Sequence, residues 1–526
     1  MSATEEHPAA GGLAPLSPAT TGTGLPAIAL LYLLGLMMPF DFSIGSLAMS
    51  PSRIVLLAVI VPLMINLFTG KYGRVLPADI FFTLHMFWVG VALAVNNPDR
   101  VVQNFGATAL EFLGGYVVGR ACIRTPAQFI ALTRFLLWVI ALSIPFALIE
   151  ARTDSAVVLE FFRKLGLNAY ADVHHEPRVG LYRAQVNFSH PIHYGLFCSV
   201  AISLAFVGLR GAISTFRRFI LTGMAVFATF LSLSSGALLA AILQIALIAW
   251  DTIFQKLRWR WLLLIGLFCL AYIVVDSLSN RNPIQVMMSY ATFSAQTAFW
   301  RAIIFEYGMK NVWNNEIFGL GLRDWDRPYW LLSSLDNFWL LMAMRYGIPG
   351  FVLIVLGYSS ALFQVGRRKF VPLTLVSNLR LGWMFTFLGL SFTLVTVHIW
   401  EVVYSFVFFL MGAGLWLIYY EPEEAAQTAP ADAGPMRGSP APLRAPAALS
   451  RAAAARIQSG DAAPVAPVAP VAPVSHEPLA ESAVSDAAAP EGAAPGADSG
   501  TPAGSGSPFT RFSQEKQRSK PPRRRY

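Results

Sequence analysis

One stretch of the sequence gathers cationic and hydrogen-bonding side chains directly ahead of an apolar run. Residues 178–195 contain two arginines, an asparagine and two histidines, and the candidates for binding among them are Arg178, Arg183, Asn187 and His190. The planar guanidinium group of arginine fits phosphate oxygens with two parallel hydrogen bonds. The segment therefore predicts a site for the phosphate of a lipid head group. The alternative is that the arginines only extend toward a membrane surface and that His190 shapes a helix start.

A second group of such side chains lies between positions 300 and 350. Its members are Arg301, Arg323, Asp336, Asn337 and Arg345. Asp336 stands immediately ahead of an apolar run, which is the usual place of a helix N-cap. A carboxylate with a cation nearby can also act as a general base toward a hydroxyl group. The sequence leaves both roles open for Asp336, and His190 is an alternative proton acceptor.

These residues belong to a chain with the composition of a membrane protein. Of its 526 residues 55% are hydrophobic and 13% are charged, which is about half the charged share of a soluble protein. Twelve apolar stretches lie near residues 25–40, 54–69, 78–95, 104–120, 127–149, 192–210, 219–233, 236–252, 260–276, 337–360, 381–397 and 402–420. A helix of about 20 residues crosses a bilayer. The sequence therefore predicts an all-α polytopic membrane protein with about twelve transmembrane helices.

Few charged residues fall inside these apolar stretches. Away from the ends of the stretches they are Glu111, Arg134 and Arg345. Ionisable groups within a membrane are candidates for function, but they also pair with one another. We expect Glu111 and Arg134 to form a structural ion pair.

The basic residues indicate how the chain is oriented. The even-numbered loops between the apolar stretches hold 14 Lys and Arg residues, whereas the short odd-numbered loops hold 2. Cytoplasmic loops carry the excess of basic residues, so both termini are expected in the cytoplasm. The net charge of +9 lies entirely in residues 1–420. About half of the basic residues in this part lie in the even-numbered loops, where the membrane topology explains them. The positive charge therefore does not indicate a nucleic-acid partner, and we expect none.

Two loops are long, and on this topology both face away from the cytoplasm. They are named here the first long loop, residues 150–191, and the second long loop, residues 277–336. Residues 25–420 are expected to form the membrane domain. Residues 1–24 and the Ala- and Pro-rich residues 421–526 are expected to be disordered, because they cannot bury enough apolar surface to offset the entropy of ordering.

The order of the motifs resembles the O-antigen ligase and O-antigen polymerase superfamily of bacterial envelopes. The similarity covers about residues 178–360. It consists of Arg-x(6)-His-Pro-x-x-Tyr-Gly, a serine-rich break at residues 231–236, an arginine in the next long loop, Gly-x-Gly, and Asp-Asn-x-x-Leu-x(4)-Arg-Tyr-Gly-Ile-Pro-Gly. The twelve predicted spans are consistent with that family, whereas the C-terminal tail falls outside the similarity.

The resemblance implies transfer of a glycan from an undecaprenyl diphosphate-linked oligosaccharide to an acceptor glycan, with inversion and without a metal or another cofactor. It implies a bacterial inner-membrane protein whose active site faces the periplasm. Arg183 and Arg301 match the arginines that hold the diphosphate, and Asp336 stands where O-antigen ligases carry a catalytic histidine. This difference favours a repeat-unit polymerase for exopolysaccharide or O-antigen over a ligase that acts on lipid A-core. Arg178, Asn187, His190, Arg323, Asn337 and Arg345 are then the expected substrate-binding residues.

Two other classes of function remain open. A transporter or flippase of lipid-linked sugars would carry broken helices and charges at the middle of the membrane. A non-enzymatic scaffold of an envelope assembly is the third possibility, for which the long tail is the best argument. Membrane lipid is an expected partner in every case, and a chain-length regulator or export proteins are further partners that the sequence leaves open.

Overall fold

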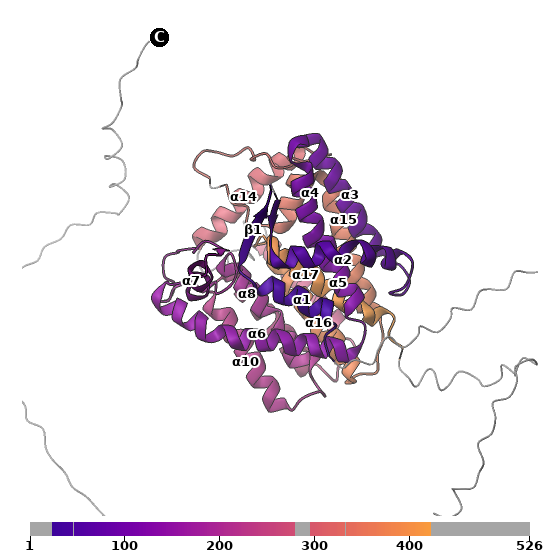
Figure 1. Cartoon of the computed structure of the whole chain (residues 1–526). Coiled ribbons are helices and arrows are strands. Elements are labelled where there is room, and N and C mark those ends of the chain that lie inside the picture. The colour runs from indigo at the N-terminus through magenta and orange to yellow at the C-terminus, as the bar shows by residue number, and fades with distance from the viewer. Residues whose placement is uncertain (1–23, 46, 279–294, 332, 422–526) are drawn as a thin grey trace, which may run out of the picture. The chain divides into compact units, whose positions relative to one another are not determined.

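The structure is a computed structural model that describes residues 24–45, 47–278, 295–331 and 333–421. The two segments expected to be disordered lie almost entirely outside the described residues, as does part of the second long loop. The helices are α1 (Ala27–Met37), α2 (Pro51–Phe68), α3 (Pro77–Asn96), α4 (Val101–Ala109), α5 (Gly115–Cys122), α6 (Pro126–Thr153), α7 (Val157–Lys164), α8 (Pro191–Ser199), α9 (Ala201–Ser203), α10 (Thr215–Leu231), α11 (Ser235–Ile253), α12 (Arg260–Leu278), α14 (Ala295–Asn314), α15 (Phe338–Arg367), α16 (Leu375–Thr393) and α17 (Glu401–Gly414) (Figure 1).

The helices confirm a membrane-embedded, mainly α-helical protein. Among the described residues, eight helices are long and apolar enough to cross a bilayer: Pro51–Phe68, Pro77–Asn96, Pro126–Thr153, Pro191–Gly208, Ser235–Ile253, Arg260–Leu278, Phe338–Arg367 and Glu401–Ile418. The other four predicted spans also fall on helical segments, namely α1, the run from α4 to α5, α10 and α16. The count of twelve spans and their orientation stay predictions.

The centre of the bundle depends on small residues that let helices approach closely. Every residue of α17 from Val402 to Gly414 is buried, and α17 packs along α5. A Cβ atom on Gly119 of α5 would lie 2.1 Å from the Phe409 carbonyl oxygen, and one on Gly412 would lie 2.1 Å from the Tyr116 carbonyl oxygen. Only glycine fits at these two positions, which is the usual way that membrane helices pack tightly.

One ion pair inside the bundle differs from our expectation. The predicted pair between Glu111 and Arg134 is wrong, because Glu111 accepts from Arg53 instead, with an Nη2–Oε1 distance of 2.6 Å and an Nε–Oε1 distance of 3.0 Å. Arg53 lies 58 residues away in the chain. Packing of α2 against the segment that contains Glu111 brings the two groups together.

A small sheet departs from the all-α prediction. Strand β1 (Phe40–Ile44) pairs antiparallel with β2 (Leu47–Met49) and with β3 (Asn168–Ala169), in the order β2-β1-β3. The Asp41↔Asn168 and Phe40↔Ala169 pairs join the segment after α1 to the first long loop. The sheet thereby fixes this loop against the start of the bundle.

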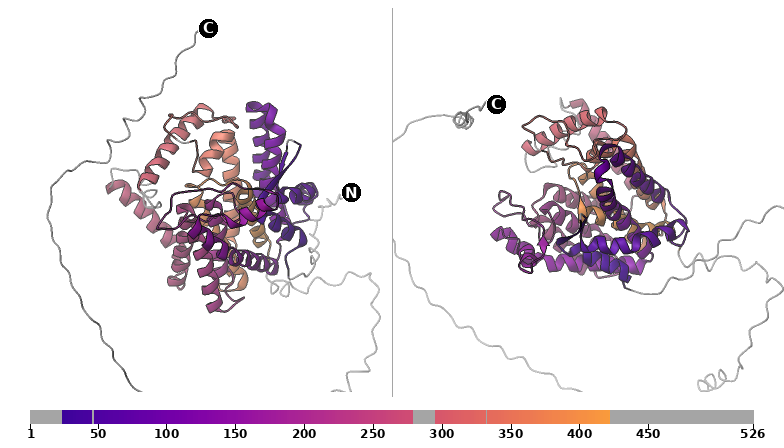
Figure 2. Two further views of the ribbon diagram at one scale, coloured as in Figure 1. Left: turned by 60° about the vertical axis from the view of Figure 1, so that its left-hand side comes forward. Right: turned by 45° about the horizontal axis from the view of Figure 1, so that its top comes forward.

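The second long loop builds a small core of its own. Helix α14 lies beside the first part of α15 (Figure 2). Buried apolar residues of these two helices and of the segment that connects them form a separate cluster: Ile304, Val312, Trp325, Leu331, Leu340, Ala343 and Met344. This part of the loop is therefore a packed unit attached to α15.

Helix α15 is broken near its middle by a glycine. Gly347 has φ 70° and ψ 179°, and Pro349 follows two residues later. The Gly-x-Gly segment of the second long loop fills the break, where the Leu320 and Gly321 N–H groups donate to the Met344 and Arg345 carbonyl oxygens at 2.7 and 2.9 Å. The two glycines of that segment therefore serve close packing, Gly319 against α15 and Gly321 against Asn97 at the end of α3.

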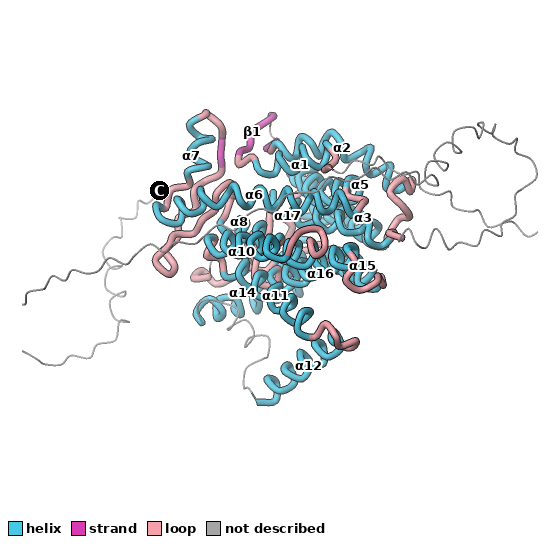
Figure 3. The backbone as a smooth tube through the Cα atoms, turned by 90° about the horizontal axis from the view of Figure 1, so that it is seen from below, coloured by secondary structure: helices cyan, strands magenta, loops and turns pink. Residues whose placement is uncertain are grey.

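Helix α12 differs from the other long helices. None of its residues is buried, and in Figure 3 it projects away from most of the bundle. Its Trp261 and Phe268 rings contact Phe385 and Phe392 of α16, with centroids 5.5 and 6.5 Å apart. It leads directly into the undescribed residues 279–294.

Candidate active site

The serine-rich break between α10 and α11 prepares the first part of the site. Helix α10 ends at Leu231 and α11 begins at Ser235, and the Ser234 hydroxyl caps α11 by accepting from the Ala237 N–H at 3.4 Å. Leu233 adopts a left-handed φ of 44°. The last carbonyl groups of a helix have no partner within it. The break therefore presents carbonyl oxygens to the first long loop.

These carbonyl oxygens hold two of the predicted arginines. Leu231 O accepts from Ala184 N–H at 3.1 Å, Ser232 O accepts from Arg183 Nε–H at 3.4 Å, and Leu233 O accepts from Arg178 Nη1–H at 2.8 Å. A cation at the C-terminal end of a helix also interacts favourably with the helix dipole. Arg178 and Arg183 are thus positioned by the backbone of the α10–α11 break.

A buried carboxylate and a buried amide order the loop around Arg183. The Glu150 carboxylate at the end of α6 accepts from the Gln185 and Val186 N–H groups, at 3.1 and 2.9 Å. The Gln185 amide donates to the Ala171 and Phe188 carbonyl oxygens, both at 3.1 Å. Our sequence reasoning missed Glu150 and Gln185. The signal in the sequence that could have identified Glu150 is that it is a lone carboxylate directly after the apolar stretch 127–149.

Arg301 comes from α14 in the second long loop. Its Nε and Nη1 atoms are buried, and neither has a hydrogen-bond partner among the described residues. A buried N–H donor without a partner is costly, particularly on a charged group. Such an arrangement is typical of a side chain whose partner is a ligand.

Asp336 and Asn337 have different roles at the start of α15. Asn337 is the N-cap, because its side-chain oxygen accepts from the Leu340 N–H at 3.0 Å. Asp336, one residue earlier, does not cap the helix. The helix-cap alternative for Asp336 is therefore wrong, and Asn337, which we expected to bind substrate, has its side-chain oxygen engaged in capping.

The charges of Asp336 and the arginines act on one another. Burial raises the pKa of Asp336, and the charges of Arg301 and Arg183 act in the opposite direction. Burial lowers the pKa of Arg183 to about 10; the charge of Arg178 adds to this effect and that of Asp336 opposes it. Burial also lowers the pKa of Arg301, opposed by Asp336. We name Arg178, Arg183, Arg301 and Asp336 the arginine–aspartate cluster.

The cluster is held at a distance and does not form a closed ion pair. The ion pairs between described residues do not join Asp336 to either Arg183 or Arg301. The cluster combines three cations and one carboxylate from loops more than 100 residues apart. It therefore has an excess of positive charge, with Arg183 buried and the other three side chains partly buried. Such a site attracts an anion and orients it through guanidinium groups.

His190 lies beside this cluster but is engaged as a helix cap. Its Nδ1 accepts from the Ile192 N–H at 3.1 Å at the start of α8. Burial lowers the pKa of His190 to about 3, and the charge of Arg183 contributes. The neutral ring then carries its proton on Nε2, so its basic nitrogen is occupied. Asp336 is consequently the better-placed proton acceptor.

The remaining predicted residues lie in other contacts. The Asn187 amide donates to the Met37 carbonyl oxygen at 2.9 Å, and Arg323 Nη2 donates to Asn96 Oδ1 at 2.8 Å. Arg345 lies near His398: burial lowers the pKa of His398 to about 3, and the charge of Arg345 lowers it further. None of the charge interactions found for Asp336, Arg183 and Arg301 involves Arg345. The structure thus brings together Arg178, Arg183, Arg301, Asp336 and His190.

Comparison with known proteins adds no family to this geometry. No family model matches the chain, and no curated protein matches its sequence.

Proposed function

We propose that this protein is a glycosyltransferase of the bacterial inner membrane that uses a glycan linked to undecaprenyl diphosphate. The observation that carries the proposal is the arginine–aspartate cluster. In it, Arg183 and Arg301 from two separate loops both interact electrostatically with the Asp336 carboxylate. A diphosphate needs cationic hydrogen-bond donors, and an acceptor hydroxyl needs a base. The cluster offers both within a membrane-embedded protein.

In the proposed reaction an acceptor hydroxyl oxygen attacks the anomeric carbon of the donor sugar. The new bond joins carbon to the acceptor oxygen, the bond from carbon to the diphosphate oxygen breaks, and that oxygen keeps the electron pair. Asp336 takes the hydroxyl proton. The guanidinium groups of Arg183 and Arg301 stabilise the negative charge that develops on the leaving diphosphate. A single displacement of this kind inverts the anomeric carbon.

The product we favour is a polymer of repeat units, which makes the protein an exopolysaccharide or O-antigen polymerase with its site at the periplasmic face. Asp336, at a position where the ligases of the similar superfamily carry histidine, supports this choice. Ligation to lipid A-core is the alternative product of the same chemistry.

Transport of lipid-linked sugars is the second candidate, and the break in α15 favours it. Discontinuous helices with charges near them are typical of transporters. Here, however, the carbonyl oxygens of Met344 and Arg345 at the break accept from the N–H groups of Leu320 and Gly321. A break that is closed by protein backbone provides no site for a transported solute.

The test uses the full chain in a strain that lacks its own copy of the gene. Arg301→Ala and Asp336→Asn are expected to abolish the polymer, whereas Arg163→Ala, a control in the first long loop that pairs with Asp172, retains it. Acceptors that carry one repeat unit indicate a lost polymerase, and long chains left on the lipid carrier indicate a lost ligase. Wild-type amounts and lengths of glycan in both cluster variants would refute the proposal.

A further inference from the structure

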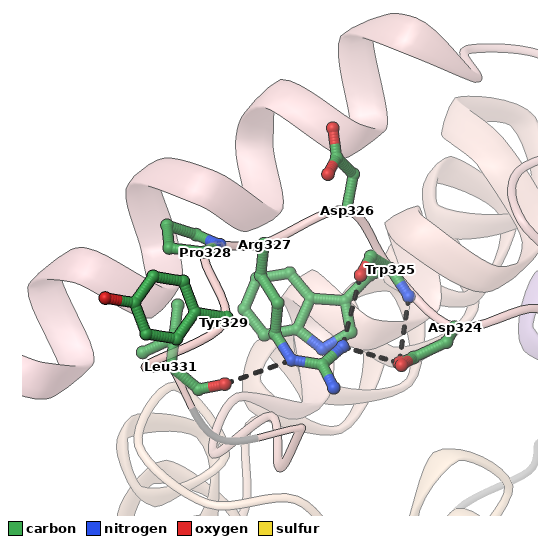
Figure 4. Close-up of a pocket in the computed structure, with 7 residues that line it drawn as sticks. All are labelled: Asp324, Trp325, Asp326, Arg327, Pro328, Tyr329 and Leu331. Atoms are coloured by element: carbon green, nitrogen blue, oxygen red, sulfur yellow. Dashed lines mark hydrogen bonds and ion pairs between the residues drawn. The ribbon is translucent and has the colours of Figure 1, made fainter. Parts of the chain in front are cut away.

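A pocket lies in the part of the second long loop that connects α14 to α15 along the chain. It has a volume of about 220 Å³ and is lined by Asp324, Trp325, Asp326, Arg327, Pro328, Tyr329 and Leu331 (Figure 4). None of these residues belongs to the arginine–aspartate cluster. The pocket combines carboxylates, a guanidinium group and aromatic rings, so its chemistry calls for an explanation of its own.

The walls of this pocket are fixed by hydrogen bonds. Arg327 Nη1 donates to Asp324 Oδ1 at 2.7 Å, and its guanidinium lies over the Trp325 ring, 5.4 Å from the centroid. Trp325 is buried, and its Nε1–H donates to the Ser333 carbonyl oxygen at 3.1 Å. The buried Asn311 amide binds the backbone of Asp326 twice, at 2.8 Å in each case. The pocket is therefore preorganised by α14.

Aromatic rings continue from the pocket to α14. Trp300, Tyr329 and Trp330 are exposed, whereas Tyr307 is partly buried and has Lys310 Nζ 4.5 Å from its ring centroid. The Trp330 ring lies 5.9 Å from the Trp300 ring and 6.4 Å from the Tyr307 ring, between centroids. The exposed fractions of Trp300, Trp330 and Tyr329 are 37%, 47% and 100%. The Trp300–Trp330 planes are tilted by 52°, so the two rings do not cover each other face to face. This group of rings, Trp300, Tyr307, Tyr329 and Trp330, is named the aromatic platform.

We infer that the aromatic platform and the adjoining pocket form a binding subsite for an oligosaccharide. The electron-rich face of an aromatic ring attracts the weakly positive C–H groups on the face of a sugar ring. The Asp324 and Asp326 carboxylates are exposed, and carboxylates accept hydrogen bonds from sugar hydroxyl groups. An acyl chain would leave these charged groups without partners, so the mixture of aromatic and charged groups fits a glycan better than a lipid tail.

The chain connects this subsite to the arginine–aspartate cluster at two points. Trp300 directly precedes Arg301, and the Ser333 carbonyl that Trp325 holds is three residues before Asp336. We assign the subsite to the acceptor glycan, and this assignment rests on the proposed function. A glycan on the platform would thus be bound by the same long loop that carries Arg301 and Asp336.

The test measures glycan binding by the full-length protein in lipid nanodiscs. The probes are maltohexaose, cellohexaose and the glycan released by mild acid from cells that make this protein, with saturation-transfer NMR as the readout. We expect Trp330→Ala and Trp300→Ala each to weaken binding of the released glycan at least tenfold, and Trp330→Phe to retain most of it. Trp313→Ala is the matched control, because Trp313 is 59% exposed on the same helix but lies about 20 Å from Trp300 along the helix axis.

Each outcome decides the inference. Binding at the wild-type level in Trp300→Ala and Trp330→Ala would overturn it, as would an equal loss in Trp313→Ala. A variant that changes nanodisc insertion but not glycan binding would show a lipid contact in place of a glycan subsite. Asp336→Asn is expected to bind glycan normally while losing transfer. If it keeps transfer, the proposed catalytic role fails, and the binding subsite is judged separately by the tryptophan variants.

Discussion

The two long loops hold their arginines in different ways. In the first long loop, Arg183 and Arg178 donate to carbonyl oxygens at the α10–α11 break. In the second, Arg301 keeps two buried nitrogen atoms without a hydrogen-bond partner in the described part of the chain. The first loop therefore uses its arginines partly to hold its own structure, whereas the second leaves Arg301 for a ligand. The difference predicts which variants lose activity alone and which also lose stability.

The largest expected effect is that of Asp336→Asn. It removes the proposed base without changing size, and Asn337 still caps α15. We expect the transfer rate to fall about 10³-fold at an unchanged melting temperature, measured with lipid-linked donor and purified protein. A clear drop in melting temperature would assign Asp336 a structural role and would weaken the contrast between the two loops.

The next largest effects are expected for Arg301→Met and Arg183→Met, which are compared by transfer rate and melting temperature. Each is expected to lower the transfer rate about 10²-fold, because each removes a donor to the leaving diphosphate. Arg301→Met should leave the melting temperature unchanged or higher, since it removes a buried cation that lacks partners. Arg183→Met should lower it, because the Ser232 carbonyl loses its partner. A reversed order of melting temperatures would contradict the comparison between the loops.

A smaller effect is expected for Glu150→Gln, which tests the support of the first long loop. The amide can accept from only one of the Gln185 and Val186 N–H groups and presents its own N–H₂ to the other. We expect the free energy of unfolding to fall by about 1–3 kcal/mol. Thermal unfolding of the protein in detergent measures this change. Gln128→Glu, on the cytoplasmic side of the predicted topology, is the control and should not disturb the loop.

The smallest expected effect is a shift in the pH profile. The proposed base acts when it is deprotonated, so the transfer rate falls as the pH drops through the pKa of Asp336. Burial raises the pKa of Asp336 and Arg301 lowers it. Arg301→Gln therefore moves the acid limb of the profile to higher pH, whereas Arg163→Gln leaves it unchanged. An acid limb that stays in place in Arg301→Gln would show that the titrating base is not Asp336.

Much of the helical fold could be predicted because the apolar stretches are long and local. Each of the twelve stretches falls on helical segments, although eight meet the length and composition of a membrane span in the described residues. The sheet of β1, β2 and β3 could not be predicted, because β3 has two residues and its partner lies more than 120 residues earlier. The partner of Glu111 was missed for the same reason, since pairing depends on how helices pack.

For the site, sequence alone identified the residue types and their order. Arginines ahead of apolar runs, an Asp-Asn pair at a helix start and a serine-rich break are all local patterns. Only the tertiary structure decided that Asn337 caps α15, that His190 is engaged as a cap, and that Arg183 and Arg301 act on the same carboxylate. The physical reason is that apolar periodicity and capping act within a few residues, whereas burial, charge interactions and backbone carbonyl partners depend on segments that meet only when the chain folds.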